Sequence, residues 1–240
     1  IASGFITAIL QTKMGINSLL AGIIVNTGLY SINIAVMSGS SILNMNKTDT
    51  VFTKMAALLK GTPVARQSKL FVAIIAVAAV AVILGLFLKT RLGLAIRATG
   101  DNPDMVRSSS VNPAFTTIIG LCVANSFTAL SGCLLAQSQR SVNIDIGTGM
   151  VTIALASLLI GGVFLGRKKM PLRIFGMVLG AFIFRLIYTI ALRFDMPAFM
   201  LKFVSSVIVI AAIATPYFKK QLPLLKRRIQ TRSGRRKADA

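Results

Sequence analysis

The stretch Leu70-Phe-Val-Ala-Ile-Ile-Ala-Val-Ala-Ala-Val-Ala-Val-Ile-Leu-Gly-Leu-Phe-Leu88 decides the fold, because none of its nineteen residues carries a polar side chain. An α-helix rises ~1.5 Å per residue, so this stretch would span roughly 28 Å, close to the thickness of the hydrocarbon core of a bilayer. A helix also satisfies every backbone hydrogen bond within the segment, as lipid requires. The stretch therefore predicts a transmembrane helix.

The composition of the whole chain also indicates a protein that is surrounded by lipid. Of the 240 residues, 55% are hydrophobic and 14% are charged, whereas ordinary soluble proteins carry about 25% charged residues. A net charge of +21 would indicate a nucleic-acid-binding protein if the basic residues formed a stripe on a folded soluble face. They lie between apolar runs instead, so we expect lipid around the chain and no nucleic-acid partner.

Further apolar runs of about twenty residues predict further membrane spans. The expected fold is all-α, a polytopic transmembrane helical bundle over residues 1–218 with a short cytoplasmic coupling helix. The apolar run at 1–10 is too short to cross, and we interpret it as the end of a truncated span. Full spans are predicted near residues 16–37, 70–88, 113–136, 150–166, 172–192 and 198–218.

The orientation follows from the basic residues of the loops, which concentrate on the cytoplasmic side of a membrane. They cluster at 89–107, 167–173 and 219–240, which share one side if the spans alternate. We therefore expect a multi-pass plasma-membrane protein with a cytoplasmic C-terminus, a cytoplasmic loop at 89–112 and an external loop at 38–69. The tail 219–240 is too polar to fold alone, and anionic lipid headgroups are its expected contact.

Two loops carry helical patterns of their own. In the external loop, residues 50–60 are amphipathic and predict either an interfacial helix or a surface that docks a partner. In the cytoplasmic loop, residues 89–97 are interpreted as a cationic hairpin and Gly100 as a flexible approach. Asn102 can cap a short helix that begins at Pro103 and runs through Ser110. From these residues alone, a polar connector and a docking element both remain open.

Three groups of motifs resemble one known family. The first is Arg91-Leu-Gly-Leu-Ala-Ile-Arg97-Ala-Thr-Gly100-Asp101-Asn102-Pro103, followed by Val111-Asn112. The second pairs Ile160-Gly-Gly-Val-Phe-Leu-Gly166 with Gly176-Met-Val-Leu-Gly180, and the third is Gln11-Thr-Lys-Met-Gly15 with Thr27-Gly-Leu-Tyr30. Together they resemble the membrane permease subunits of ATP-binding-cassette importers, in the branched-chain amino acid and ribose class. The resemblance extends over nearly all of the chain up to Phe218.

The resemblance implies a translocation pathway for a small solute, an amino acid or a related compound. It also implies a second permease copy or paralogue, cytoplasmic ATP-binding subunits and an extracytoplasmic solute-binding protein. The ATP-binding subunits would sit on the cytoplasmic loop, which would couple ATP hydrolysis to transport. The coupling residues would be Arg97, Gly100, Asp101, Asn102, Pro103, Met105 and Arg107.

The residue types of the chain agree with an external energy source. Ion-driven transporters place carboxylates or histidines inside the membrane, but the chain has no glutamate or histidine, and its aspartates fall in loops, at a span edge or in the tail. It contains no Gly-x-x-x-x-Gly-Lys-Ser/Thr phosphate loop, so we expect a transport subunit rather than an enzyme. Cys122 and Cys133, eleven residues apart in one predicted helix, cannot pair with each other. No metal site or cofactor is predicted.

Polar residues inside the predicted spans are the candidates for the translocation pathway. Asn26, Tyr30 and Asn33 share one helix face, and Asn125 and Thr128 repeat the pattern in a later span. Interhelical hydrogen bonding is the alternative role for both groups. Arg185 lies in the middle of the span at 172–192, where an arginine costs at least ~2.5 kcal/mol unless it reaches water or a partner. Its partner would be a carbonyl array, Asp145 or Asp195, or a substrate carboxylate.

Glycines at small-x-x-x-small spacing predict close contacts between helices, at Gly162 with Gly166 and at Gly176 with Gly180. These contacts would serve tight helix packing or a dimer interface.

A permease that works with an ATPase is the leading hypothesis. The alternative is a membrane scaffold or assembly protein, or a passive channel, in which the basic loops serve topology only. These readings differ in whether an ATP-binding subunit copurifies with the chain.

Overall fold

The computed structural model describes residues 1–46, 48–58, 67–147, 150–165 and 170–193, together with the single positions 203, 206, 207, 210 and 214. The described chain is mostly helical, which confirms the predicted fold class. It divides into two compact units, Ile1–Asp145 and Ile146–Ala240. Most of the predicted span at 198–218 and the whole tail lie outside the described residues.

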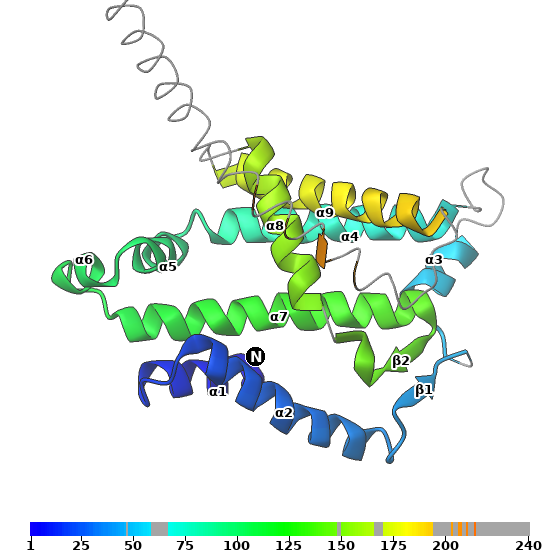
Figure 1. The fold of residues 1–240 in the computed structure, drawn as a ribbon, viewed down its shortest axis with the longest axis horizontal. Coiled ribbons are helices and arrows are strands. Elements are labelled where there is room, and N and C mark those ends of the chain that lie inside the picture. Colours follow the sequence, from blue (N-terminus) through cyan, green and yellow to red (C-terminus); the bar gives the residue numbers. More distant parts are fainter. Residues whose placement is uncertain are drawn as a thin grey trace, which may run out of the picture. The chain divides into compact units, whose positions relative to one another are not determined.

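The first unit contains seven helices and two short strands among its described residues (Figure 1). In the order of the chain, these elements are α1 (Ala2–Thr12), α2 (Ser18–Val36), β1 (Ile42–Asn44), α3 (Val51–Leu58), α4 (Ser68–Phe87), α5 (Arg91–Asp101), α6 (Pro103–Ser108), α7 (Pro113–Gln139) and β2 (Ser141–Asn143). Helix α3 falls within the amphipathic pattern predicted at 50–60. Helix α5 was not predicted, since we interpreted its first half as a hairpin.

Side chains at the helix starts explain several of these boundaries. Asn17 caps α2 and Asn112 caps α7 by accepting a hydrogen bond from a backbone N–H of the first turn, which has no partner within the helix. Pro113 follows Asn112 at the first position of α7, where a missing N–H costs nothing. Asn112 and Pro113 thus begin α7 at the start of the span predicted at 113–136.

Helix α1 lies against α7 (Figure 1). The contact is close because Gly4 has no side chain: a Cβ at that position would stand 2.6 Å from the backbone oxygen of Leu121. Ala8, one turn later in α1, is fully buried. Small residues therefore let the two backbones approach, as they commonly do between membrane helices.

The strands β1 and β2 form an antiparallel pair with Ile42 opposite Asn143 and Asn44 opposite Ser141. This pair was not predicted, because three-residue strands give no detectable alternation of polar and apolar residues. The backbone N–H of Met45 also donates to the carbonyl oxygen of Arg140 at 2.9 Å. The segment after α2 is thereby fixed to the end of α7.

The second unit contains α8 (Met150–Leu165) and α9 (Met170–Arg193), which pack on each other. A Cβ at Gly161 would collide with the backbone of Gly176, and a Cβ at Gly180 would collide with the backbone of Ser157. Around these contacts Ala156, Ile160 and Phe184 form a buried cluster. No described atom lies within 4 Å of the Cβ position of Gly162, so the structure shows no contact for it within the described part of the unit; Gly166 is outside the described residues.

Four described helices are long and apolar enough to cross a membrane: α2, α4, α7 and the part of α9 at Met170–Ile190. Each coincides with a predicted span. Helix α8 is shorter, with 16 residues. Many large apolar side chains of these helices are exposed, among them Leu19, Ile74, Val82 and Phe182. Such a surface suits lipid, in which apolar side chains need no cover and only the backbone must be satisfied internally.

Candidate functional site

The end of the first unit formed by α5 and α6 contains the predicted coupling residues, and its base is a tight turn. Helix α4 ends at Phe87 and α5 begins at Arg91. The hydroxyl of Thr90 accepts a hydrogen bond from the N–H of Gly93 at 3.2 Å and so caps α5. A Cβ at Gly93 would collide with the backbone of Phe87 and Leu88. The turn therefore fixes the direction in which α5 leaves the membrane span.

A second cap divides α5 from α6. Asn102 has an extended backbone, and its side-chain oxygen accepts hydrogen bonds from the N–H groups of Asp104 and Met105 at 3.1 and 3.2 Å. This confirms the predicted cap. The interpretation of Gly100 as a flexible approach is wrong, because Gly100 lies within α5. The helix after Pro103 is also shorter than predicted: it ends at Ser108, and Ser110 has a positive φ of 60°.

The seven predicted coupling residues all lie on the exposed surface of this end. Met105 is apolar, yet it keeps 65% of its surface exposed. Val106 is turned inward and 5% exposed, and its carbonyl oxygen accepts the N–H of Val111 at 3.3 Å. One apolar side chain thus anchors α6 while the predicted residues face outward: Arg97, Gly100, Asp101, Asn102, Pro103, Met105 and Arg107.

A pair of threonines attaches α5 to α7, and the sequence analysis missed it. The hydroxyls of Thr99 and Thr116 lie 2.7 Å apart, and Thr116 is almost fully buried. Ile96 also packs against Gly120, where a Cβ would stand 3.3 Å from the isoleucine side chain. Ile96 and Thr99, three residues apart on α5, thus contact Gly120 and Thr116, four residues apart on α7. This spacing was present in the sequence, but nothing in the sequence showed that α5 is a helix.

The predicted pathway residues of α2 lie on the surface of the first unit. Asn26, Tyr30 and Asn33 are all exposed, and Tyr30 retains 47% of its accessible surface. They share a face of α2, as their spacing predicts.

The pathway candidates of α7 are placed differently. Asn125 is half-buried, donates to the carbonyl oxygen of Leu121 and accepts from the hydroxyl of Ser3 in α1 at 3.4 Å. Thr128 is exposed and donates to the carbonyl oxygen of Ala124 in its own helix. The structure therefore gives Asn125 a contact between helices and leaves Thr128 on the surface.

Arg185 lies in α9, in the second unit, and is exposed among the described residues of that unit. Its carbonyl oxygen accepts the hydroxyl of Thr189 at 2.8 Å. Phe184, its neighbour in the chain, is buried against α8 and stacks with Tyr188 at a centroid distance of 6.4 Å. Arg185 consequently points away from the glycine contact of α8 with α9.

Chemistry that needs a metal or a disulfide has no visible site in the described part of the chain. No group of three His, Cys, Asp or Glu residues comes together there. Cys122 and Cys133 are both free, which confirms that they do not pair with each other.

Comparison with known proteins places this arrangement in a family. Residues 1–213 match the family described as "Branched-chain amino acid transport system / permease component". A "Tyrosine transport system permease protein" from Clostridioides difficile is 32% identical over 213 residues, which make up 89% of this chain and 68% of that protein. No solved structure matches the chain significantly.

Other relatives are importers with different named substrates. The "Galactose/methyl galactoside import permease protein MglC" of Salmonella typhimurium is 36% identical over 118 residues, 49% of this chain and 33% of that protein. The "Autoinducer 2 import system permease protein LsrC" of Escherichia coli is 28% identical over 129 residues, 53% of this chain and 37% of that protein. These comparisons and the four membrane-length helices confirm the resemblance drawn from the motifs. The chain is a multi-pass membrane protein that belongs to the family of branched-chain amino acid transport system permease components.

Proposed function

We propose that this chain is the permease subunit of an ATP-driven importer, and that ATP-binding subunits dock on its α5–α6 end. The exposed coupling surface supports the proposal most strongly. It projects from two membrane-length helices, α4 and α7, and is fixed to both, by the Gly93 turn to α4 and by the Thr99–Thr116 hydroxyl pair to α7. A movement of the docked ATP-binding subunits would therefore be transmitted to α4 and α7, because the element between them is fixed to both helices.

The surface also has the chemistry of a docking site. Met105 presents an exposed apolar side chain, and the polar residues Arg97, Asp101 and Arg107 are exposed on the same α5–α6 end. Apolar anchors surrounded by polar residues are typical of protein interfaces, in which the anchor supplies most of the binding free energy. Gly100 lies beside this surface with nothing within 4 Å of its Cβ position. A partner could therefore approach the α5 backbone closely at Gly100.

The docking proposal is tested by a series of substitutions at Gly100 in the assembled transporter. Gly100→Ala should leave solute-stimulated ATP hydrolysis unchanged, while Gly100→Leu and Gly100→Trp should lower it progressively by occupying the space of the partner. The open surroundings of Gly100 mean that the fold tolerates all three, which thermal unfolding checks. If the Gly100→Trp transporter retains its ATP-binding subunits and its stimulated hydrolysis, the docking assignment fails. If no ATP-binding subunit copurifies with the wild-type chain, the result favours a scaffold or a passive channel.

We further propose that α5 and α6 lie on the cytoplasmic side, together with the C-terminus. A single cysteine introduced by Ala98→Cys, on the exposed surface of α5, tests this after Cys122 and Cys133 are replaced by serine. A membrane-impermeant maleimide should label it in inside-out vesicles and not in intact cells. Labelling in intact cells would reverse the proposed topology.

The proposed cargo is an amino acid or a related compound, delivered by an extracytoplasmic binding protein to a pathway formed with a second permease copy or paralogue. Its support is the extent of the similarity, since the tyrosine permease matches 89% of this chain and the galactose permease 49%. Uptake of labelled tyrosine and labelled galactose by reconstituted transporter separates the two classes. Uptake of galactose alone would contradict the proposal.

The residues proposed to face the pathway are Asn26, Tyr30, Asn33, Asn125, Thr128 and Arg185. Their support is polarity within membrane-length helices, where an exposed polar side chain needs water or a partner. Cysteine at each position, reacted with a water-soluble thiol reagent, should be protected by transported solute.

A further inference from the structure

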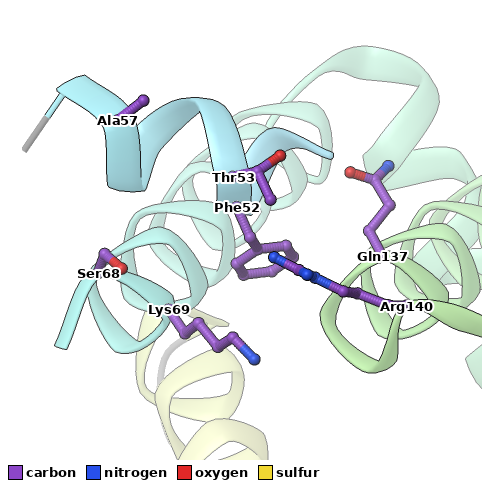
Figure 2. Close-up of a pocket in the computed structure, with 7 residues that line it drawn as sticks. All are labelled: Phe52, Thr53, Ala57, Ser68, Lys69, Gln137 and Arg140. Carbon is purple, nitrogen blue, oxygen red and sulfur yellow. The ribbon is translucent and has the colours of Figure 1, made fainter. Parts of the chain in front are cut away.

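A pocket lies at the end of α7 that is remote from α5 and α6. Helix α7 has 27 residues, so its two ends stand about 40 Å apart. The pocket has a volume of about 190 Å³ and opens between α3, the start of α4 and the end of α7 (Figure 2). Its lining residues are Phe52, Thr53, Ala57, Ser68, Lys69, Gln137 and Arg140.

Hydrogen bonds and burial hold one wall of the pocket in place. The side-chain oxygen of Gln137 accepts the N–H of Val51 at 3.0 Å, which fixes the start of α3 to α7. Thr50 and Thr53 cap the start of α3 reciprocally, each hydroxyl accepting a hydrogen bond from the backbone N–H of the other residue. Phe52 is 7% exposed and forms an apolar wall. The pocket is therefore a built feature of the first unit.

Two cations from different helices converge on this pocket. Figure 2 shows the side chain of Arg140, from the end of α7, extending toward Phe52, while the side chain of Lys69, from the start of α4, lines the same pocket without pointing at the ring. Arg140 adopts the left-handed conformation, with a φ of 55°, as the C-cap of α7. Among the described residues, neither side chain forms a hydrogen bond or an ion pair. Two like charges that face one hollow repel each other, and an anion between them would remove that repulsion.

The position of the pocket along the helices indicates which kind of anion is present around it. Both α4, which begins here at Ser68, and α7, which ends here at Gln139, are long and apolar enough to cross a membrane. Directly after Lys69, the apolar side chains of Leu70 and Phe71 are 56% and 41% exposed. The hydrocarbon region therefore begins next to the pocket, and the two cations stand at the level of the lipid headgroups.

We propose that this pocket binds the phosphate group of an anionic membrane lipid. The guanidinium of Arg140 suits two phosphate oxygens and the ammonium of Lys69 supplies a point charge. Phe52 and Ala57 offer apolar contact to the glycerol and the first part of the acyl chains. Basic pockets between transmembrane helices bind anionic lipid headgroups on the cytoplasmic side of membranes, and the same charge attraction acts on anionic lipids of the opposite leaflet. A bound lipid would join α3, α4 and α7, and this role is independent of the transported solute and of the docking of an ATPase.

The test compares lipid retention in matched variants of the assembled transporter. The protein is reconstituted in an equimolar mixture of phosphatidylglycerol and phosphatidylcholine, extracted in mild detergent, and its bound lipids are counted by native mass spectrometry. Arg140→Gly removes one cation and suits the left-handed backbone, and Lys69→Gln removes the other. Lys54→Gln is the control, because Lys54 is an exposed lysine of α3 that does not line the pocket.

Each pocket substitution should weaken retention of phosphatidylglycerol about fivefold, and the double variant about 25-fold, whereas Lys54→Gln should match the wild type. Added inorganic phosphate should compete with the retained lipid. Equal retention in all variants overturns the proposal. So does binding of inorganic phosphate without a preference for phosphatidylglycerol, which would indicate a soluble anion. Unchanged retention with loss of affinity for the purified binding protein would assign the cations to an acidic surface of that partner and also overturn it.

Discussion

The two ends of α7 differ in how their polar side chains are satisfied. At the α5–α6 end, Thr116 is buried and bonded to Thr99, and Asn112 caps the helix. At the other end, Lys69 and Arg140 face a pocket with no ion pair among the described residues. The first end is complete within the chain and exposes its charges outward, as a rigid docking element requires. The second end leaves cationic charge for something outside the chain to neutralise.

The largest expected effect comes from Gly93→Val, which would break the rigid end at its base. Its Cβ would collide with the backbone of Phe87 and Leu88, and backbone can give way only if the α4–α5 turn opens. Overpacking costs about 1–3 kcal/mol, and we expect the upper end of that range or loss of folded protein. Thermal unfolding of the purified protein measures the change. Gly100→Val, in open space on the same helix, is the control, and equal melting of both variants would contradict a rigid turn.

A smaller effect is expected from Asn102→Ala, which removes the cap of α6. Two backbone N–H groups, of Asp104 and Met105, would lose their acceptor, at a cost of about 1 kcal/mol because both can turn to water. Amide hydrogen exchange should accelerate at these two residues and not at the start of α7. Asn102→Ser should preserve the slow exchange, since serine caps as well. Unchanged exchange in the alanine variant would show that α6 does not depend on its cap.

Thr116→Val tests the attachment of α5 to α7 with an effect of similar or smaller size. The substitution keeps the shape and removes the hydroxyl, while Thr99 still donates to the carbonyl oxygen of Ala95. One hydrogen bond is lost, so we expect about 1 kcal/mol of destabilisation. Faster hydrogen exchange throughout α5, with α1 unaffected, would be the local sign of detachment. Thr116→Ser should behave as the wild type, and a valine variant of wild-type stability would contradict the attachment.

The smallest effect is expected at the pocket end of α7, where a substitution should stabilise the protein instead of destabilising it. Arg140 has a positive φ, which disfavours every residue with a Cβ by roughly 1 kcal/mol. Arg140→Gly should therefore raise the free energy of unfolding by up to about 1 kcal/mol, whereas Arg140→Ala should not. Chemical or thermal unfolding in detergent compares the two. A glycine variant that is less stable than the alanine variant would show that the strain is absent.

Much of the fold could be predicted because its signals are local. Nineteen apolar residues at 70–88 have no other stable form in lipid than a helix, and α4 contains all of them except Leu88, its C-cap. Asn102-Pro103 and Asn112-Pro113 begin helices because cap and proline act on the adjacent turn alone. The residues that we propose as the coupling surface were identified from their resemblance to the family motifs.

The features that were missed depend on contacts between distant residues. Residues 89–97 were interpreted as a hairpin and Gly100 as a flexible approach. In the structure Gly93 allows close contact between the start of α5 and the end of α4, and Gly100 lies within α5. The strand pair at Ile42 and Asn143 exists only because α7 brings its two segments together. The contacting glycines of α8 and α9 are Gly161, Gly176 and Gly180, and spacing alone could not tell Gly161 from Gly162.

The sequence by itself determined that this chain is surrounded by lipid, where several of its helices begin and which family it belongs to, since hydropathy, caps and motifs act over a few residues. The tertiary structure alone decided which residues meet: Thr99 with Thr116, and Lys69 with Arg140 around Phe52. The physical reason is that a hydrogen bond or a pair of converging charges requires two positions in space. Residues 71 apart in the chain become neighbours only when antiparallel spans bring the start of one helix to the end of another.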